Sequence, residues 1–371
     1  MTTDRMPEAS AGSAPIRTLR LAVEASASSA GAVEFVREAE RLGVHAAWAA
    51  EMWGYDAFTQ LGYLAAQTST IRLGTSIVQL GARTPAMLAM SAMSLQQLTG
   101  GRFTLGIGAS GPQIMEGWHG VWFRTPVQAT RETIEIIRMI SRGERLDYQG
   151  RVYQLPLPGS QGRAIRSMAA PVRIPIYVAA IGPANMRLTG ELADGWLGNA
   201  FIPESAEVFL APLREGAESA GRTLADLDLQ VPVAVEFTDE ADEAVARHAA
   251  GYAFTIGAMG SGTTNFYNEA FARQGFGEEV RTVQRLWREG RRDEAARLVP
   301  LAIGQKTNLL GTAAMVRERV RLYRGAGIGT LAVKLSGPLQ TRLDTLAQLM
   351  ELVDEVNREG PSLAGVTSGD S

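Results

Sequence analysis

Residues 71–85, Ile-Arg-Leu-Gly-Thr-Ser-Ile-Val-Gln-Leu-Gly-Ala-Arg-Thr-Pro, open the segment that decides the fold. The apolar run 71–80 is rich in β-branched residues and too short for a domain helix, so it predicts a buried strand. Thr84-Pro85 then offers a cap and a preset first turn for a helix that continues to the glycine stop at 100–101. The apolar run 102–108 predicts the next strand, and a strand, a helix and a strand at this spacing form one parallel βαβ unit.

The same unit recurs along the chain. Six further apolar runs predict strands, and they span residues 18–24, 44–50, 174–180, 195–199, 229–235 and 329–335. Eight strands, each followed by a helix, predict a (β/α)8 TIM barrel that occupies residues 17–358 as a single domain. The alternative is a doubly wound open sheet, which would place a glycine-rich turn after the first strand. The chain has Glu24-Ala-Ser-Ala-Ser at that position, so the barrel is favoured.

Two segments interrupt the repeat, and two tails flank it. Tyr, Gly and Pro punctuate residues 146–171, which predicts a surface hairpin and loop. Residues 239–327 are too long for one crossover and predict a helical insertion between strands seven and eight, near the barrel mouth. Residues 1–16 are polar and small and predict a disordered tail, and residues 359–371 predict a flexible one.

Composition excludes several classes of function. The chain of 371 residues carries a net charge of -3, so no basic face is expected for nucleic acid. It has no cysteine, and its three histidines lie far apart in the sequence, so we expect no disulfide and no metal site. No apolar run reaches the roughly 18 residues of a membrane span, and no signal peptide is recognisable, so no membrane partner and a cytoplasmic location are expected.

The chemistry of a barrel lies at the carboxyl ends of its strands, where this chain carries two carboxylates. Glu24 ends strand one, and it is either a solvated strand end or a desolvated group with a raised pKa that can exchange a proton. Glu51 follows strand two and is open to the same two interpretations. Trp48 is expected in the core or at the rim. His119, in the loop after strand four, is a further candidate, for which the sequence identifies no orienting partner.

Two glycine-containing loops follow neighbouring strands. Residues 106–111, Gly-Ile-Gly-Ala-Ser-Gly, could cradle a phosphate with backbone amides, or could be a tight turn. Residues 181–185, Ile-Gly-Pro-Ala-Asn, lie between a strand and a helix, where the helix amides favour an anion. Two such loops side by side favour a phosphate-bearing ligand.

Short motifs from about residue 19 to residue 356 resemble the bacterial luciferase-like superfamily, in particular its coenzyme F420-dependent branch. The motifs are Trp48-Ala-Ala-Glu-Met, Ile71-Arg-Leu-Gly-Thr, Arg83-Thr-Pro, Thr99-Gly-Gly-Arg-Phe-Thr-Leu-Gly-Ile-Gly, Tyr177-Val-Ala-Ala-Ile-Gly-Pro and Ala193-Asp-Gly-Trp, with Asn265-Phe-Tyr and Arg273-Gln-Gly-Phe-Gly in the insertion. The family fold is a (β/α)8 barrel with insertions.

The resemblance implies that the deazaflavin F420 binds at the barrel mouth and carries a hydride at its C5 atom. It implies a non-prolyl cis peptide at Ser76–Ile77 behind the deazaflavin ring, and a phosphate tail held near residues 108–110 and 182–183. The cofactor contacts expected are Met52, Thr75, Ser76, Ile77, Gly108, Ala109, Ser110, Ala179, Ala180, Ile181, Gly182 and Pro183.

The resemblance also bears on the reaction. Methylenetetrahydromethanopterin reductases of this branch look similar at Val23-Glu24, which favours a proton role for Glu24 on the substrate side, with Glu51 as the second candidate. The sugar-phosphate dehydrogenases have Asp-His where this chain has Glu51-Met52, which argues against alcohol oxidation. We therefore expect an F420-dependent oxidoreductase that reduces a C=C or C=N bond of a small molecule.

Two alternative functions and a second subunit are also expected from the resemblance. An FMN-dependent monooxygenase of the same superfamily would also carry a phosphate that suits both loops, and a non-catalytic F420 or flavin carrier would need neither glutamate. The superfamily commonly pairs its barrels through helices two and three, and the Met-rich helix 85–98 suits a buried face. A homodimer is therefore expected.

Overall fold

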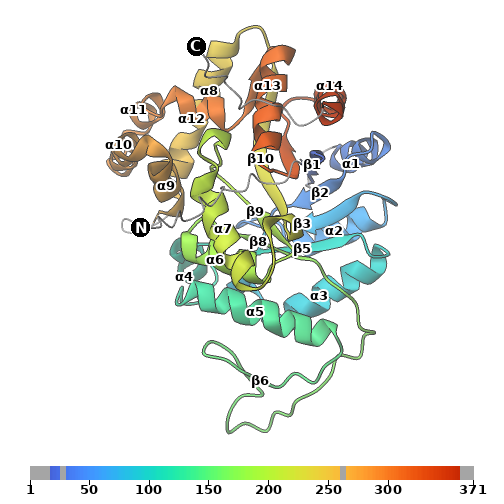
Figure 1. Ribbon diagram of the computed structural model, residues 1–371. Coiled ribbons are helices and arrows are strands. Elements are labelled where there is room, and N and C mark those ends of the chain that lie inside the picture. Colours follow the sequence, from blue (N-terminus) through green and yellow to red (C-terminus); the bar gives the residue numbers. More distant parts are fainter. Residues whose placement is uncertain (1–16, 26–30, 260–264, 360–371) are drawn as a thin grey trace, which may run out of the picture.

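Eight parallel strands form a closed ring in the computed structural model, which describes residues 17–25, 31–259 and 265–359 (Figure 1). In order around the ring they are β1 (Arg20–Glu24), β2 (Ala46–Ala49), β3 (Arg72–Thr75), β5 (Phe103–Gly108), β8 (Ile176–Ala179), β9 (Gly195–Leu197), β10 (Asp228–Phe237) and β12 (Thr330–Lys334). The ring closes because β12 pairs with β1 on one side and with β10 on the other. The predicted (β/α)8 barrel is therefore confirmed.

Helices follow the strands and cover the outside of the ring. They are α1 (Ala32–Arg41), α2 (Ala57–Ala65), α3 (Pro85–Leu98), α5 (Pro126–Ser141), α6 (Pro183–Leu192), α7 (Glu207–Ser219), α13 (Ala313–Gly325) and α14 (Leu339–Arg358), with the short α4 (Pro112–Gly117) before α5. The sequence signals for the helix starts work as expected: Thr84 Oγ1 accepts a hydrogen bond from Met87 N at 3.2 Å, and Asp56 caps α2 through Phe58 N and Thr59 N. No helix in the described part of the chain is long and apolar enough to cross a membrane.

The predicted strand 71–80 is divided in two. It forms β3 and, after the Ser76–Ile77 peptide bond, β4 (Val78–Gln79), and that bond is cis. Both pieces pair with β5, through Leu73↔Phe103 and Val78↔Ile107. The apolar composition of the run gave no sign of this division, because both pieces are buried.

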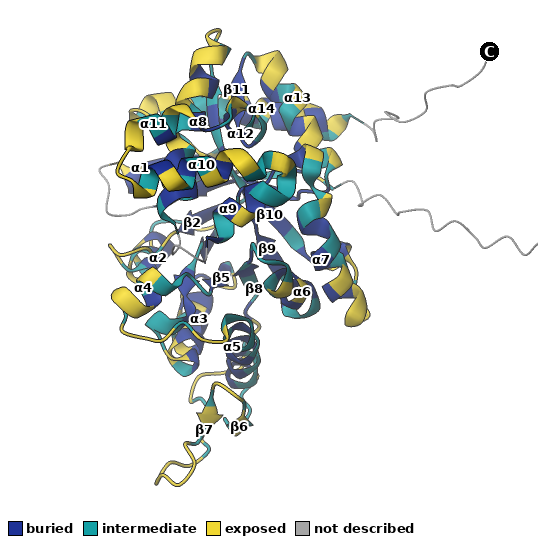
Figure 2. Ribbon diagram, turned by 90° about the vertical axis from the view of Figure 1, so that its left-hand side faces the viewer, coloured by how far each residue is buried: buried dark blue, intermediate teal, exposed yellow. Residues whose placement is uncertain are grey.

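The insertion after β10 contains α8 (Ala241–Ala258), α9 (Phe266–Phe271), a π-helical segment (Ala272–Phe276), α10 (Gly277–Arg288), α11 (Arg292–Arg297) and α12 (Leu301–Lys306). It also contains a strand that the sequence did not predict, β11 (Leu309–Gly311). β10 continues beyond the ring and pairs with β11 through Val235↔Leu309 and Phe237↔Gly311. Three residues are too few for a strand pattern, so tertiary pairing decided this element. Figure 2 shows the insertion helices stacked at the end of the molecule opposite the β6–β7 hairpin.

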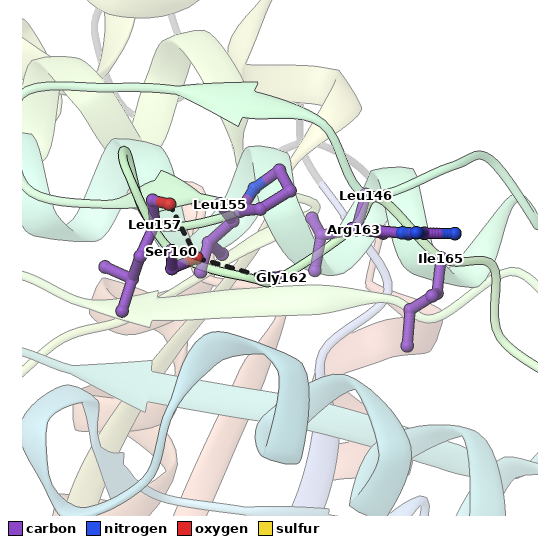
Figure 3. Close-up of a pocket in the computed structure, with 8 residues that line it drawn as sticks. Leu146, Leu155, Leu157, Ser160, Gly162, Arg163 and Ile165 are labelled. Atoms are coloured by element: carbon purple, nitrogen blue, oxygen red, sulfur yellow. Dashed lines mark hydrogen bonds between the residues drawn. The ribbon is translucent and has the colours of Figure 1, made fainter.

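The antiparallel hairpin β6 (Tyr148–Gln149) and β7 (Gln154–Leu155) projects beneath α5 (Figure 1). It connects the end of α5 to the start of β8, so it lies at the amino-terminal end of the barrel. A hollow of about 240 Å³ lies inside this segment between residues 146 and 165 (Figure 3). Because catalysis in such barrels occurs at the opposite end, the hollow is not part of the site.

Residues inside the ring differ from those outside it. Outward-facing side chains pack with the helices in one large hydrophobic core, whereas Ala22, Ala46 and Trp48 form a separate inner cluster with Tyr177 and Ala332. This separation follows the two-residue period of a strand. The predicted tail 1–16 and residues 360–371 of the predicted tail 359–371 lie outside the described residues, but Glu359 is described and pairs with Arg321 at 2.6 Å.

Candidate active site

Three polar side chains stand side by side at the carboxyl end of the ring. Glu24 on β1 is the register partner of Trp48 on β2, and Val23 on the other side pairs with Val333, next to Lys334 on β12. Glu24 and Lys334 each lie two residues beyond an inner alanine, so they face the inside of the barrel at its mouth. The Nζ atom of Lys334 lies 3.7 Å from Glu24 Oε1, and their side chains are 52% and 62% exposed. Glu24 is therefore solvated and not desolvated, so any proton exchange would take place between an exposed carboxyl group and a substrate at the mouth.

Trp48 lies deeper in the same row and is 5% exposed. The indole edge that carries Cε3 and Cζ3 covers Gly74, where a Cβ atom would clash with the ring. The ring centroid is 5.8 Å from that of Tyr177. Trp48 Nε1 is buried and, within the described part of the chain, donates no hydrogen bond. Trp48 is therefore not only a hydrophobic core residue, because its buried indole N–H has no hydrogen-bond acceptor among the described residues.

Glu51 has a different environment from Glu24. Arg83 donates two hydrogen bonds to its carboxylate, from Nη1 to Oε1 at 2.6 Å and from Nη2 to Oε2 at 2.7 Å. Ala57 N, at the start of α2, donates to Oε2 at 3.2 Å. Arg83 also reaches Asp56 at 2.9 Å, and its hydrogen bonds to Glu51 raise the pKa of the guanidinium. Both Glu51 oxygens are therefore engaged, which favours a positioning role over the proton role expected from the sequence.

Gln79 links Glu51 to His119. The Gln79 side-chain amide donates from Nε2 to the Glu51 carbonyl at 3.4 Å, and its Oε1 lies 2.6 Å from His119 Nε2. Because Oε1 is an acceptor, His119 Nε2 carries the proton in this arrangement. The orienting partner that the sequence did not identify is thus Gln79, 40 residues away along the chain.

The walls of the mouth between β3 and β5 permit very close approach. A Cβ atom at Gly106 would clash with the Thr75 carbonyl, and one at Gly108 would lie 3.0 Å from the Ile77 side chain. Thr75 Oγ1 donates to Gly106 O at 2.7 Å and accepts from Gly106 N at 2.8 Å. Thr75 is fully buried and supports the wall from behind, whereas Ser76, Ile77, Ala109 and Ser110 are partly exposed. Glycine at 106 and 108 suits a flat ring lying close to the backbone.

The second predicted loop leads into α6. Gly182 precedes the helix, and a Cβ atom there would meet no atom within 4 Å, so the space in front of the helix is open. Ala180 is buried and its carbonyl accepts a hydrogen bond from Trp196 Nε1 at 2.8 Å, whereas Ala179, Ile181 and Pro183 are partly exposed. Arg273 of the insertion donates from Nη2 to the Ile181 carbonyl at 2.7 Å, and burial lowers the pKa of this guanidinium. A cation therefore stands beside the helix amides, which suits an anionic group.

The structure brings most of the predicted residues to one end of the barrel. The loops after β3, β5 and β8 are neighbours, and Met52 lies half-exposed in the loop after β2. Sequence reasoning missed Lys334, Gln79, Arg273 and the orphan donor of Trp48. Lys334 was within reach of the sequence, because it is next to the last residue of the predicted strand 329–335.

Comparison with known proteins places this geometry in a family. Residues 13–330 match the model of the luciferase-like monooxygenase family. The chain is 37% identical over 318 residues, 83% of its length and 92% of the relative, to a Mycobacterium tuberculosis protein provisionally named a coenzyme F420-dependent oxidoreductase. It is 26% identical, over 79% of its length and 86% of the relative, to 5,10-methylenetetrahydromethanopterin reductase of Archaeoglobus fulgidus.

Solved structures agree in fold. The coenzyme F420-dependent tetrahydromethanopterin reductase of Methanopyrus kandleri superposes with a TM-score of 0.74 at 23% identity, over 91% of this chain and 98% of that one. An FMN-bound Baeyer–Villiger monooxygenase from Pseudomonas putida superposes with a TM-score of 0.62 at 19% identity, over 91% and 98% of the two chains. The barrel, its open carboxyl end and the match over most of its length mean that this chain belongs to the luciferase-like monooxygenase family.

Proposed function

We propose that the chain is an F420-dependent oxidoreductase that transfers a hydride between the deazaflavin and a small organic substrate. The observation that carries the proposal is the position of Glu24. It faces the inside of the barrel mouth, on the side of the ring opposite the loops after β5 and β8 that suit a phosphate-bearing cofactor. The names of the relatives from Mycobacterium tuberculosis and Archaeoglobus fulgidus support F420 as that cofactor and oxidoreduction as the chemistry.

The cofactor would lie along β3, β5 and β8. Reduced F420 supplies a hydride from C5 when it is bound. Ser76, Ile77 and Gly108 would support one face of the ring, and the amides near Ser110 and Gly182 would hold the phosphate, with Met52 at the rim. Thr75 and Ala180 would act from behind by fixing the strand ends.

Glu24 would handle the proton, since hydride addition to a C=C or C=N bond must be completed by a proton. Its carboxyl group is accessible from the mouth and has Lys334 as a cationic neighbour at 3.7 Å. Glu51 and Arg83 would keep the loop after β2 in place, next to the cofactor. Gln79 would orient His119 at the same rim.

Cofactor binding tests the proposal directly. Equilibrium dialysis and tryptophan quenching should show tight binding of F420 and weak binding of FMN. Gly182→Glu places a negative charge in open space before α6 and should weaken F420 binding by about tenfold or more, whereas Gly251→Glu, on an exposed part of α8, should not. Preference for FMN would favour a monooxygenase instead, and binding of neither would refute the cofactor site.

We also propose that the chain forms a homodimer through α2 and α3. Leu88, Met93 and Leu95 of α3 are buried, whereas Met87 and Met90 on its other side and Tyr63 of α2 are exposed. These side chains form an apolar surface on two helices that contact each other. Light scattering should give the mass of a dimer, and Met90→Glu should give that of a monomer, with Met168→Glu in the exposed segment between β7 and β8 as the control.

A further inference from the structure

The segment between α5 and β8, residues 142–173, extends away from the barrel as an arm that contains the β6–β7 hairpin (Figure 1 and Figure 2). Hydrogen bonds to α5 hold the hairpin turn in place. The carboxylate of Glu132, a fully buried residue of α5, accepts from three consecutive backbone N–H groups of that turn. They belong to Arg151, Val152 and Tyr153, at donor–acceptor distances of 2.7, 3.0 and 2.8 Å. The arm is therefore fixed to the barrel through α5.

The arm is positively charged. It contains six arginines and two acidic residues, in a chain whose net charge is -3. Arg142 pairs with Glu144 at 2.5 Å, and Arg173 pairs with Asp194 at 2.9 Å. The remaining arginines are exposed and form no ion pair with any residue in the described ranges, and they are Arg145, Arg151, Arg163 and Arg166. Their charge is thus available to an anionic partner.

Large apolar side chains are exposed on the same arm. Met168 is fully exposed, and the exposed fractions of Ile165 and Leu157 are 70% and 66%. Leu157, Ile165 and Arg163 line one hollow of about 240 Å³ (Figure 3). The other residues that line this hollow include Leu146, Leu155 and Pro156. An arginine without an ion pair and two exposed aliphatic side chains therefore border the same apolar hollow.

We propose that the arm binds the surface of an anionic lipid bilayer. The guanidinium groups contact the lipid phosphates, and Leu157, Ile165 and Met168 enter the region between the headgroups and the acyl chains. The apolar hollow bordered by Arg163 suits a lipid, because a lipid joins an acyl chain to an anionic headgroup.

Charge and apolar exposure together favour a bilayer over two other partners. A nucleic acid would pair with the arginines through its phosphates but would leave the aliphatic side chains in water. A second copy of this chain, placed as in the proposed dimer, offers the helices α2 and α3, which contain no acidic residue. That face therefore provides no counter-charge for the arm.

The proposed contact leaves the active site open to water. The arm connects the end of α5 to the start of β8, at the amino end of the barrel, whereas Glu24 and Lys334 lie at the carboxyl end. The inference therefore does not depend on the cofactor or on the reaction. The expectation of no membrane partner was based on the lack of a spanning segment, and a contact at the bilayer surface needs none.

Sedimentation of the full chain with vesicles tests the proposal. The chain should sediment with vesicles of phosphatidylglycerol and phosphatidylcholine in equal parts, and not with phosphatidylcholine alone. Arg163→Glu/Arg166→Glu should lower the partition coefficient about tenfold or more, whereas Arg281→Glu/Arg288→Glu on exposed positions of α10 should leave it unchanged. Equal binding to both kinds of vesicle, or an equal loss in the α10 variant, would overturn the proposal.

The apolar part of the contact has its own test. Ile165→Gln/Met168→Gln should weaken vesicle binding about fivefold, whereas Leu298→Gln/Leu301→Gln, at exposed positions of the insertion, should not. Because the chain has no cysteine, Met168→Cys provides a single site for the fluorophore acrylodan. Its emission should shift to shorter wavelength with anionic vesicles, and acrylodan at Met315→Cys should show no shift.

Three further results would each overturn the proposal. Acrylodan emission at position 168 that anionic vesicles leave unchanged would show that the arm stays in water. Stronger binding of an RNA oligonucleotide than of anionic vesicles would make the arm a nucleic-acid contact. A monomer mass for Arg163→Glu/Arg166→Glu in light scattering would assign the arm to the contact between subunits.

Discussion

Both ends of the barrel interior hold charged side chains. At the amino end these side chains are hydrogen-bonded to one another, whereas at the carboxyl end they are mostly exposed. At the amino end, Asp228 accepts hydrogen bonds from Arg20 at 2.7 Å, Tyr177 at 3.0 Å, Gln230 at 3.1 Å and Thr330 at 3.3 Å. At the carboxyl end, Glu24 has Lys334 at 3.7 Å and stands beside the orphan donor of Trp48.

Arg20 and Glu24 lie on the same face of the same strand, so the strand itself does not cause the difference. At the amino end the side chains bond to one another and stabilise the fold, whereas at the carboxyl end the side chains of Lys334 and Glu24 stay exposed and accessible to a ligand. This is the division of labour known for such barrels.

The largest effect is expected from removing the hydrogen-bonded carboxylate at the amino end of the barrel. Asp228 is 11% exposed and accepts four hydrogen bonds, so Asp228→Asn weakens all four and should lower the free energy of unfolding by about 3 kcal/mol. Urea denaturation measures this loss, with the exposed Asp147→Asn as the control. The remaining folded enzyme should keep its kcat/KM, and a variant that loses activity at unchanged stability would contradict the comparison.

The second largest effect is expected on activity, from a change at the carboxyl end of the barrel. Glu24→Gln keeps the size of the side chain and removes the proton, so kcat/KM with reduced F420 should fall about 100-fold. Because Glu24 is exposed, the free energy of unfolding should stay within about 0.5 kcal/mol of the wild type. Glu34→Gln on the outer surface of α1 is the matched control. A Glu24 variant with full activity would remove the proton role.

Glu51 refines the comparison of the two ends. It lies at the carboxyl end, but its carboxylate is hydrogen-bonded to protein groups like that of Asp228. Glu51→Gln or Arg83→Met should each cost about 2 kcal/mol, since each leaves one partner of a mostly buried pair alone. The double variant Glu51→Gln/Arg83→Met should lose less than the sum of the two single changes. Thermal unfolding of the four proteins checks this, and strict additivity would mean that the pair is not coupled.

The smallest expected effect is a pH dependence of the free energy of unfolding, which arises from His45 at the amino end. Burial, together with the charges of Arg20 and Arg72, lowers the pKa of His45 from 6.5 to about 4 against the opposing effect of Asp228. The unfolded chain therefore binds a proton between pH 6.5 and pH 4 that the folded chain does not, and stability falls as the pH falls through this range. Allowing for partial exposure, the loss should be about 1–2 kcal/mol.

Urea midpoints from pH 7 to pH 4 measure the slope of this dependence. His45→Asn should flatten the slope, because asparagine takes up no proton in this range. An unchanged slope would assign the effect to other groups, such as the carboxylates of the outer surface.

Much of the fold could be predicted from the sequence. The β-branched runs, the Thr84-Pro85 start and the glycine stops are local signals, and they placed eight strands and their helices correctly. The strand β11 and the division of strand three were missed, because three-residue pairing and a change within a buried run leave no periodic pattern. The insertion was expected to be helical, and its short strand is created by the extended end of β10.

The site was predicted in part. The strand-end rule placed Glu24 and the glycine loops, because it depends only on where an apolar run stops. It treated Glu51 as equivalent to Glu24, since both follow strands. Arg83 is 32 residues from Glu51, and only the structure revealed that its guanidinium occupies both carboxylate oxygens.

The sequence by itself determined the barrel, the end at which chemistry can occur and the family resemblance. All three follow from local patterns of apolar residues, helix caps and turns. The tertiary structure alone decided which polar groups satisfy one another and which stay open. Hydrogen bonds such as His119 to Gln79, and the absence of an acceptor for Trp48 within the described residues, depend on distances between strands that are remote in sequence. Such distances follow from closure of the ring, which no local pattern contains.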